Sequence, residues 1–129
     1  MRLFAPPAYW TLSNEAIKSI CNGCGTKGIG KVIPEHIWGV CVTPACYIHD
    51  FMYHIGETIA DKEEADRSFL NNMLRLIEDR GAFFLVQRLQ KRCAYGFYIA
   101  VKDFGGPAFW NAKNSKEEFK SHQKHLPLV

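Results

Sequence analysis

Long hydrophobic runs are missing from this sequence of 129 residues. No apolar stretch approaches the ~20 residues that a transmembrane helix needs, so we expect no membrane-spanning segment. The first ten residues, MRLFAPPAYW, are not expected to form a signal peptide, because their apolar stretch is short and Pro6 and Pro7 interrupt it. The five cysteines nonetheless suggest cross-links or a bound metal. Cysteine usage thus indicates an oxidising or extracellular compartment, while the localisation and the oligomeric state stay open.

The sequence also has little excess of charge. Lys and Arg total 16 against 13 Asp and Glu, which gives a formal net charge of +3. This excess is too small to indicate a nucleic-acid-binding protein, but it is compatible with attraction to an anionic membrane surface. The length suits one domain, which we place at residues 1–110, followed by a polar, basic tail at 111–129.

Strand patterns are not convincing anywhere, so the sequence predicts a mainly α fold. Residues 1–12 are expected to be extended, and a short helix follows at 14–21. Apolar residues at helical spacing, together with capping residues and terminal glycines, predict three further helices. Their expected ranges are 44–55 with Thr43 as N-cap and Gly56 at the end, 61–80 with Asp61 and Glu64 at the start, and 82–103. The last helix is apolar nearly all round at its far end and is expected to be central.

Two titratable residues stand side by side in the first of these helices, in the stretch TPACYIHDFMY. His49 and Asp50 point about 100° apart on a helix, so they cannot pair with each other but can serve two different partners. Tyr53 lies four residues after His49 and three after Asp50, so its ring can lean over both. Asp50 stands among apolar residues, where a cation would satisfy its charge.

The next helix carries a carboxylate on its apolar face. Asp66 precedes Phe69 by three residues and Leu70 by four, whereas Asp61, Lys62 and Glu63 are expected to stay in water. Burying a carboxylate is costly unless another group pairs with it. The sequence therefore predicts a partner for Asp66, unless the edge of the helix exposes it.

A glycine-rich segment, CGTKGIG at residues 24–30, precedes the His49 helix. Glycines let successive backbone carbonyls turn inward, and Ca²⁺ takes several oxygen ligands, many of them carbonyls. Four cysteines cluster in the same half of the chain and leave a zinc site open as an alternative: Cys21, Cys24, Cys41 and Cys46. No G-x-S-x-G motif is present, so water is the expected nucleophile if the protein is a hydrolase.

Together these motifs resemble the secreted phospholipase A2 superfamily, in a small form of prokaryotic type. CGTKGIG resembles the calcium loop of that family, ACYIHDFMY resembles its active-site helix, and ADRSF resembles the start of the antiparallel partner helix. The resemblance covers about residues 21–76. It implies two antiparallel helices that carry the active site, a calcium loop, a third long helix and disulfide links.

The resemblance also implies a role for each matching residue. His49 would be the general base that activates water, Asp66 would orient its imidazole, and Tyr53 would hydrogen-bond to Asp66. The implied Ca²⁺ ligands are Asp50 and the backbone carbonyls of Gly23, Gly25 and Lys27, with the Gly25 N–H as an oxyanion contact. The implied disulfides are Cys24–Cys46 and, as a second bridge, Cys21–Cys41, which leaves Cys93 free.

The function that the resemblance implies is calcium-dependent hydrolysis of the sn-2 ester of glycerophospholipids at a membrane or micelle surface. Gly23 and Lys27 depart from the family's usual loop residues. These departures favour an alternative, a catalytically silent module of the same type that binds a membrane or a protein partner. Five large aromatic residues are candidates either for an interfacial rim or for the core: Trp10, Trp38, Phe104, Phe109 and Trp110.

Overall fold

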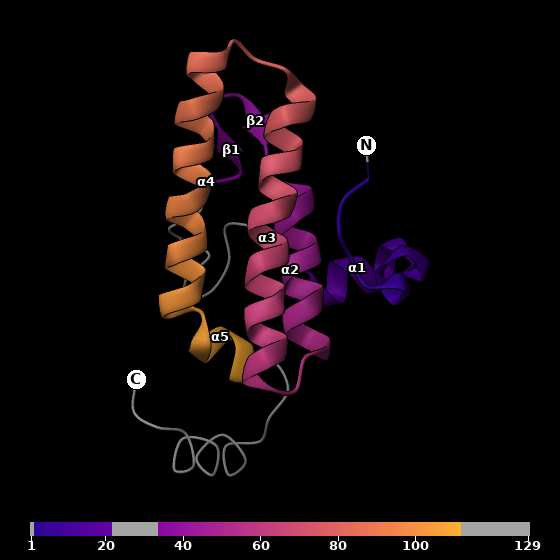
Figure 1. Ribbon diagram of the computed structural model, residues 1–129. Coiled ribbons are helices and arrows are strands. Elements are labelled where there is room, and N and C mark those ends of the chain that lie inside the picture. The colour runs from indigo at the N-terminus through magenta and orange to yellow at the C-terminus, as the bar shows by residue number, and fades with distance from the viewer. Residues whose placement is uncertain (1, 22–33, 112–129) are drawn as a thin grey trace.

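The computed structural model describes residues 2–21 and 34–111 of the chain, and Figure 1 shows a mainly helical arrangement. In chain order the elements are η1 (Pro7–Thr11), α1 (Asn14–Ile20), β1 (His36–Ile37), β2 (Val40–Cys41), α2 (Thr43–Ile55), α3 (Ile59–Arg80), α4 (Phe84–Phe104) and α5 (Gly106–Asn111). The mainly α prediction is confirmed. No helix in the described ranges combines the length and the apolar character of a membrane span. The predicted tail beyond residue 111 lies outside these ranges.

Three long helices form the body of the molecule, and α3 lies between α2 and α4 (Figure 1). The prediction that the helix at 82–103 is central is therefore wrong. Only Gln90, Ala94 and Val101 of α4 are fully buried, because α4 packs through one face on α3. Buried residues of α3, Phe69, Met73 and Ile77 among them, form the main core cluster together with residues of α2, α4 and the hairpin.

Local capping sets the boundaries of the helices. Thr43 is the first residue of α2 rather than its N-cap, a position that Val42 occupies without a side-chain hydrogen bond. α3 begins at Ile59, two residues before the predicted start at Asp61: Thr58 is its N-cap, and Asp61 completes a capping box with it. α3 ends at Arg80, as predicted. The next residue, Gly81, caps the helix in a left-handed conformation with φ of 68°. The Gly56–Thr58 link between α2 and α3 is too short for anything but an antiparallel pair.

A two-stranded hairpin was missed by the sequence analysis. β1 pairs with β2 in antiparallel register, with His36 opposite Cys41 and Ile37 opposite Val40. Trp38 and Gly39 make the turn with positive φ angles of 46° and 86°, as a tight two-residue hairpin requires. Strands of two residues leave almost no alternating pattern in a sequence, so only the turn could have indicated them.

The N-terminal segment lies along α3 rather than extending freely, and residues 7–11 form a 3₁₀ helix. The fully buried side chain of Asn72 accepts a hydrogen bond from the Phe4 N–H at 2.6 Å and donates one to the Phe4 carbonyl at 2.8 Å. Arg75 donates to the Arg2 carbonyl at 2.6 Å and stacks over the Phe4 ring. We call residues 2–6, held in this way, the N-terminal strap.

The five aromatic candidates divide between core and surface. Phe109 and Trp110 of α5 are buried, and Phe109 packs edge-on against Tyr53. Trp10, Trp38 and Phe104 are exposed. α4 ends at Phe104, one residue beyond the predicted end, and only Gly105 separates it from α5, which closes one end of the helix group.

Candidate functional site

The centre of the candidate site is a buried pair formed by α2 and α3. The Nε2 atom of His49 lies 2.8 Å from the Asp66 Oδ1 atom, and the two residues are 6% and 2% exposed. The antiparallel packing of the two helices brings these positions, 17 residues apart in sequence, to the same depth. The buried Asp66 carboxylate therefore has a partner, His49, as the sequence predicted for a carboxylate at this position.

Tyr53 joins this pair from the next turn of α2. Its hydroxyl donates a hydrogen bond to Asp66 Oδ1 at 2.6 Å, and its ring centroid lies 4.1 Å from that of His49. Burial, followed by the negative charge of Asp66, raises the pKa of Tyr53 above its ordinary value. The phenol therefore keeps its proton and remains a donor to the carboxylate.

Lys62 is the member of the site that the sequence analysis missed. Its ammonium group donates to Asp66 Oδ2 at 2.8 Å, and also to the carbonyls of Val101 and Lys102 at 3.1 and 3.2 Å. The expectation that Lys62 stays in water is wrong, because its side chain runs along α3 into the gap beneath the end of α4. Its spacing of four residues before Asp66 is the signal that could have indicated this ion pair.

The charge of Asp66 is set by competing effects. Burial pushes the pKa of Asp66 upward, but the hydrogen bond and charge of His49, with hydrogen bonds from Lys62 and Tyr53, outweigh it. The net result is a pKa below the ordinary value of 3.8. Asp66 is consequently an anion at neutral pH with both oxygens engaged, which lets it orient an imidazole ring and stabilise its protonated form.

Apolar groups surround the pair. The Phe69 ring lies 4.8 Å from the His49 ring, and Ile48 and Phe51 are buried in the same helix. Gly105 approaches the Tyr53 hydroxyl so closely that an added Cβ atom would overlap it. Such surroundings exclude water from the His49–Asp66 contact and strengthen it.

Asp50, the neighbour of His49 on α2, lies near enough to both Cys21 and Tyr53 for its charge to raise the pKa of each. Its side chain is partly buried, and its charge lies close enough to Cys21 to affect that thiol. Burial and then the charge of Asp50 raise the pKa of Cys21 to about 11. Cys21 is the last described residue before segment 22–33, which contains the predicted calcium ligands Gly23, Gly25 and Lys27.

The other predicted Ca²⁺ ligands, Gly23, Gly25 and Lys27, lie outside the described residues. Within the described part of the chain, no group of three or more His, Cys, Asp or Glu side chains is arranged to hold a metal ion. The predicted calcium set has only one carboxylate and otherwise uses backbone carbonyls. Asp50, a partly buried carboxylate, is an oxygen donor of the kind that a hard cation such as Ca²⁺ takes.

The cysteines correct one predicted disulfide. Cys21 is a buried free thiol, whereas Cys41 is a free thiol exposed on β2, so the predicted Cys21–Cys41 bridge is wrong. Cys93 is free, as predicted. Cys46 is disulfide-bonded and so cannot act as a thiolate ligand of zinc, while its predicted partner Cys24 lies outside the described residues.

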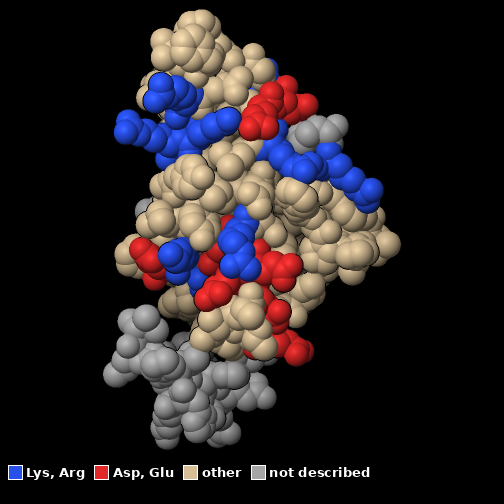
Figure 2. Space-filling view, in the orientation of Figure 1, with Lys and Arg blue, Asp and Glu red and all other residues tan. Residues whose placement is uncertain are grey.

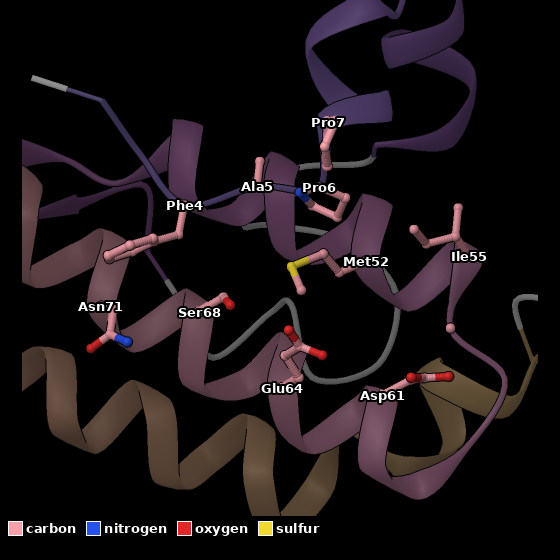
Figure 3. A pocket seen from close by; sticks show the side chains of 11 residues that line it. Phe4, Ala5, Pro6, Pro7, Met52, Ile55, Asp61, Glu64, Ser68 and Asn71 are labelled. Carbon is pink, nitrogen blue, oxygen red and sulfur yellow. The ribbon is translucent and has the colours of Figure 1, made fainter.

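A separate hollow of about 620 Å³ lies between the N-terminal strap and the helices α2 and α3 (Figure 3). Met52 and Ile55 contribute apolar surface from α2, while Glu64 and Ser68 contribute polar groups from α3. None of the residues that line it is His49, Asp50 or Asp66. The hollow is therefore distinct from the candidate site.

Comparison of the chain with family models, with curated proteins and with solved structures finds no match. The case for a function therefore depends on the residues of the site and their geometry.

Proposed function

We propose that the protein is a calcium-dependent ester hydrolase of the phospholipase A2 type, acting on the sn-2 ester of glycerophospholipids. The observation that carries this proposal is the buried contact between His49 Nε2 and Asp66 Oδ1 at 2.8 Å. A histidine oriented by a carboxylate is the arrangement that activates a water molecule by removing its proton. Tyr53 and Lys62 support the proposal because they fix the position and the negative charge of that carboxylate.

In the proposed reaction, Asp66 accepts a hydrogen bond from the Nε2–H of His49, which leaves the lone pair on Nδ1. Nδ1 takes a proton from water while the water oxygen attacks the ester carbonyl carbon. The imidazolium that forms is stabilised by the Asp66 carboxylate. The Nδ1 proton then passes to the glycerol oxygen as the ester C–O bond breaks, giving a fatty acid and a lysophospholipid.

Calcium, when bound, would supply the positive charge that polarises the ester carbonyl. Asp50 and the carbonyls of Gly23, Gly25 and Lys27 are the residues proposed to hold it, and the Gly25 N–H would add a contact to the oxyanion. The closeness of Asp50 to Cys21 supports this assignment, because Cys21 stands only two residues before Gly23 in the sequence. With a single carboxylate, we expect a dissociation constant of roughly 10⁻⁴ to 10⁻³ M.

The test is fatty-acid release from mixed phospholipid liposomes, measured with calcium and with a chelator. We expect activity only with calcium, and a loss of about 10²-fold or more in the His49→Gln variant, because the base is removed. His54→Gln is the matched control: His54 is an exposed histidine on the same helix, so its loss should leave the rate unchanged.

Two results would contradict the proposal. Equal rates with calcium and with chelator would exclude a role for the cation, and full activity of His49→Gln would exclude the base. Calcium binding without turnover of any lipid would instead favour the silent module that binds a membrane or a protein partner.

A further inference from the structure

The face of α4 that points away from α3 is covered by no other described element. Four of its apolar residues are between 43% and 52% exposed: Leu85, Leu89, Tyr95 and Ile99. They recur at intervals of four, six and four residues, which places them on one stripe of the helix about 21 Å long. This stripe lies opposite the buried residues Gln90, Ala94 and Val101.

The stripe continues into the turn between α3 and α4, at the top of Figure 1. Phe83 and Phe84 stand at this turn and are 63% and 62% exposed. Two adjacent phenylalanines in water at the end of a helix pair form a protruding apolar tip. Contiguous exposed apolar surface of this kind marks a contact with another molecule or with a membrane.

Basic residues flank the tip and the stripe. Arg80 precedes the tip, Arg88 and Arg92 lie within the stripe, and all three are exposed. The sequence has no acidic residue between Gly81 and Lys102. At this end of the molecule, Figure 2 shows atoms of uncharged residues above a group of Lys and Arg atoms, with Asp and Glu atoms on one side of that group.

The acidic residues nearest to the tip belong to α3. They are Glu78 and Asp79, and Glu78 is paired with Lys91 at 3.1 Å. They precede Arg80 in the last turn of α3, and the pair of Glu78 with Lys91 links that turn to α4. The α4 side, which carries the stripe, is basic and apolar.

We propose that the tip and the stripe, residues 83–85, 88, 89, 92, 95 and 99, dock on an anionic phospholipid surface. Phe83 and Phe84 would enter the interface between headgroups and acyl chains, while Arg88 and Arg92 contact lipid phosphates. A helix face that mixes basic and apolar side chains is typical of attachment to anionic membranes. A second copy is a poorer occupant, because a symmetric contact through this face would bring the arginines of both copies together.

This surface is remote from the candidate active site. Asp66 and Arg80 are separated by 14 residues of one continuous helix, or about 21 Å. The proposed docking does not depend on hydrolysis, and it can be measured with the chelator present, when hydrolysis is switched off.

The experiment is co-sedimentation of the full-length protein with vesicles in a chelating buffer. We compare phosphatidylcholine vesicles with vesicles that contain phosphatidylglycerol. The structure predicts binding to the anionic vesicles, weaker binding to the neutral ones, and a further decrease at high salt. Phe83→Ser/Phe84→Ser and Arg88→Gln/Arg92→Gln should each lower the partition coefficient by about ten-fold or more.

Matched controls test whether vesicle binding needs this face in particular or only an exposed aromatic or arginine side chain anywhere on the surface. Phe104→Ser removes an aromatic that is 71% exposed at the opposite end of α4, and Arg67→Gln removes an exposed arginine from α3. Both controls should bind like the unaltered protein, and circular dichroism should be the same for all variants. Equal binding by the Phe83/Phe84 variant, or no binding to anionic vesicles, would overturn the proposal. A dimer that dissociates in that variant, without vesicle binding, would overturn it in favour of an interface between two copies.

Discussion

The Asp66 carboxylate receives three hydrogen-bonded partners, and each arrives from a different position in the chain. His49 and Tyr53 share Oδ1, while Lys62 binds Oδ2. Lys62 also binds two carbonyls in the last turn of α4, where a cation is favourable for the helix dipole. One lysine thus neutralises the carboxylate and fixes the end of a neighbouring helix.

Replacing Lys62 with methionine tests this dual role. A largely buried charge-assisted contact is lost, so we expect a decrease of about 1.5–3 kcal/mol in the free energy of unfolding at pH 7. Because the pKa of Asp66 is lowered by folding, its contribution is present above the ordinary value of 3.8 and is lost as the pH falls through the folded-state pKa. The difference between Lys62→Met and the unaltered protein should therefore narrow below about pH 4.

The measurement is urea unfolding at a series of pH values. Lys91→Met is the control, since Lys91 and its partner Glu78 are both exposed and such pairs contribute at most about 1 kcal/mol. If the loss of unfolding free energy in Lys62→Met stays constant from pH 7 to pH 3, the contact of Lys62 with Asp66 is not the one that stabilises the protein.

At the scale of elements, the junction between α4 and α5 fixes the position of Tyr53. Gly105 caps α4 at a place where a Cβ atom would overlap both the Tyr53 hydroxyl and the Val101 carbonyl oxygen. The glycine is required here for close approach rather than for an unusual backbone angle. The C-terminal end of α4 therefore packs directly against the Tyr53 hydroxyl of α2.

We expect Gly105→Ala to lower the free energy of unfolding by about 1–3 kcal/mol, the usual cost of overpacking. Gly106→Ala is the matched control, because a Cβ atom there would meet nothing within 4 Å. In a Tyr53→Phe background the cost of Gly105→Ala should become smaller, since one of the two overlapping oxygens is gone. Denaturant unfolding of the four variants measures this coupling, and strictly additive effects would contradict it.

Local signals in the sequence predicted the elements well and their packing less well. The terminal glycines at positions 56 and 81 gave correct helix ends, because a helix stop depends on local backbone chemistry. The central position of α3 was missed, because apolar residues such as Tyr95 and Ile99 made α4 look buried on all sides. A membrane-facing or partner-facing stripe has the same composition as a core stripe, so periodicity alone cannot separate them.

At the scale of the whole molecule, the contact between His49 and Asp66 was predicted correctly, whereas the Cys21–Cys41 bridge was predicted wrongly. The contact could be predicted because each of the two residues belongs to a motif that defines its position on a helix. Antiparallel packing of the two helices then brings the two positions together. Cys21 and Cys41 belong to irregular segments, where sequence spacing says little about which way a side chain points. The loop residues Gly23, Gly25 and Lys27 stay a prediction.

The cysteine arrangement can be tested by alkylating the native protein without reductant. Cys41 should react rapidly because it is exposed, whereas Cys21 should react slowly because it is buried and its pKa is about 11. Mass spectrometry of the labelled peptides gives the order of reaction. If Cys21 and Cys41 react only after reduction, the bridge that we have rejected exists.

The N-terminal strap has a consequence for the biosynthesis of the chain. Phe4 reaches its hydrogen-bonding partner only when Asn72 has been made, 68 residues later, and Arg2 must wait for Arg75. The strap can therefore be fixed in place only after this part of α3 has been synthesised, so its contacts form late during translation.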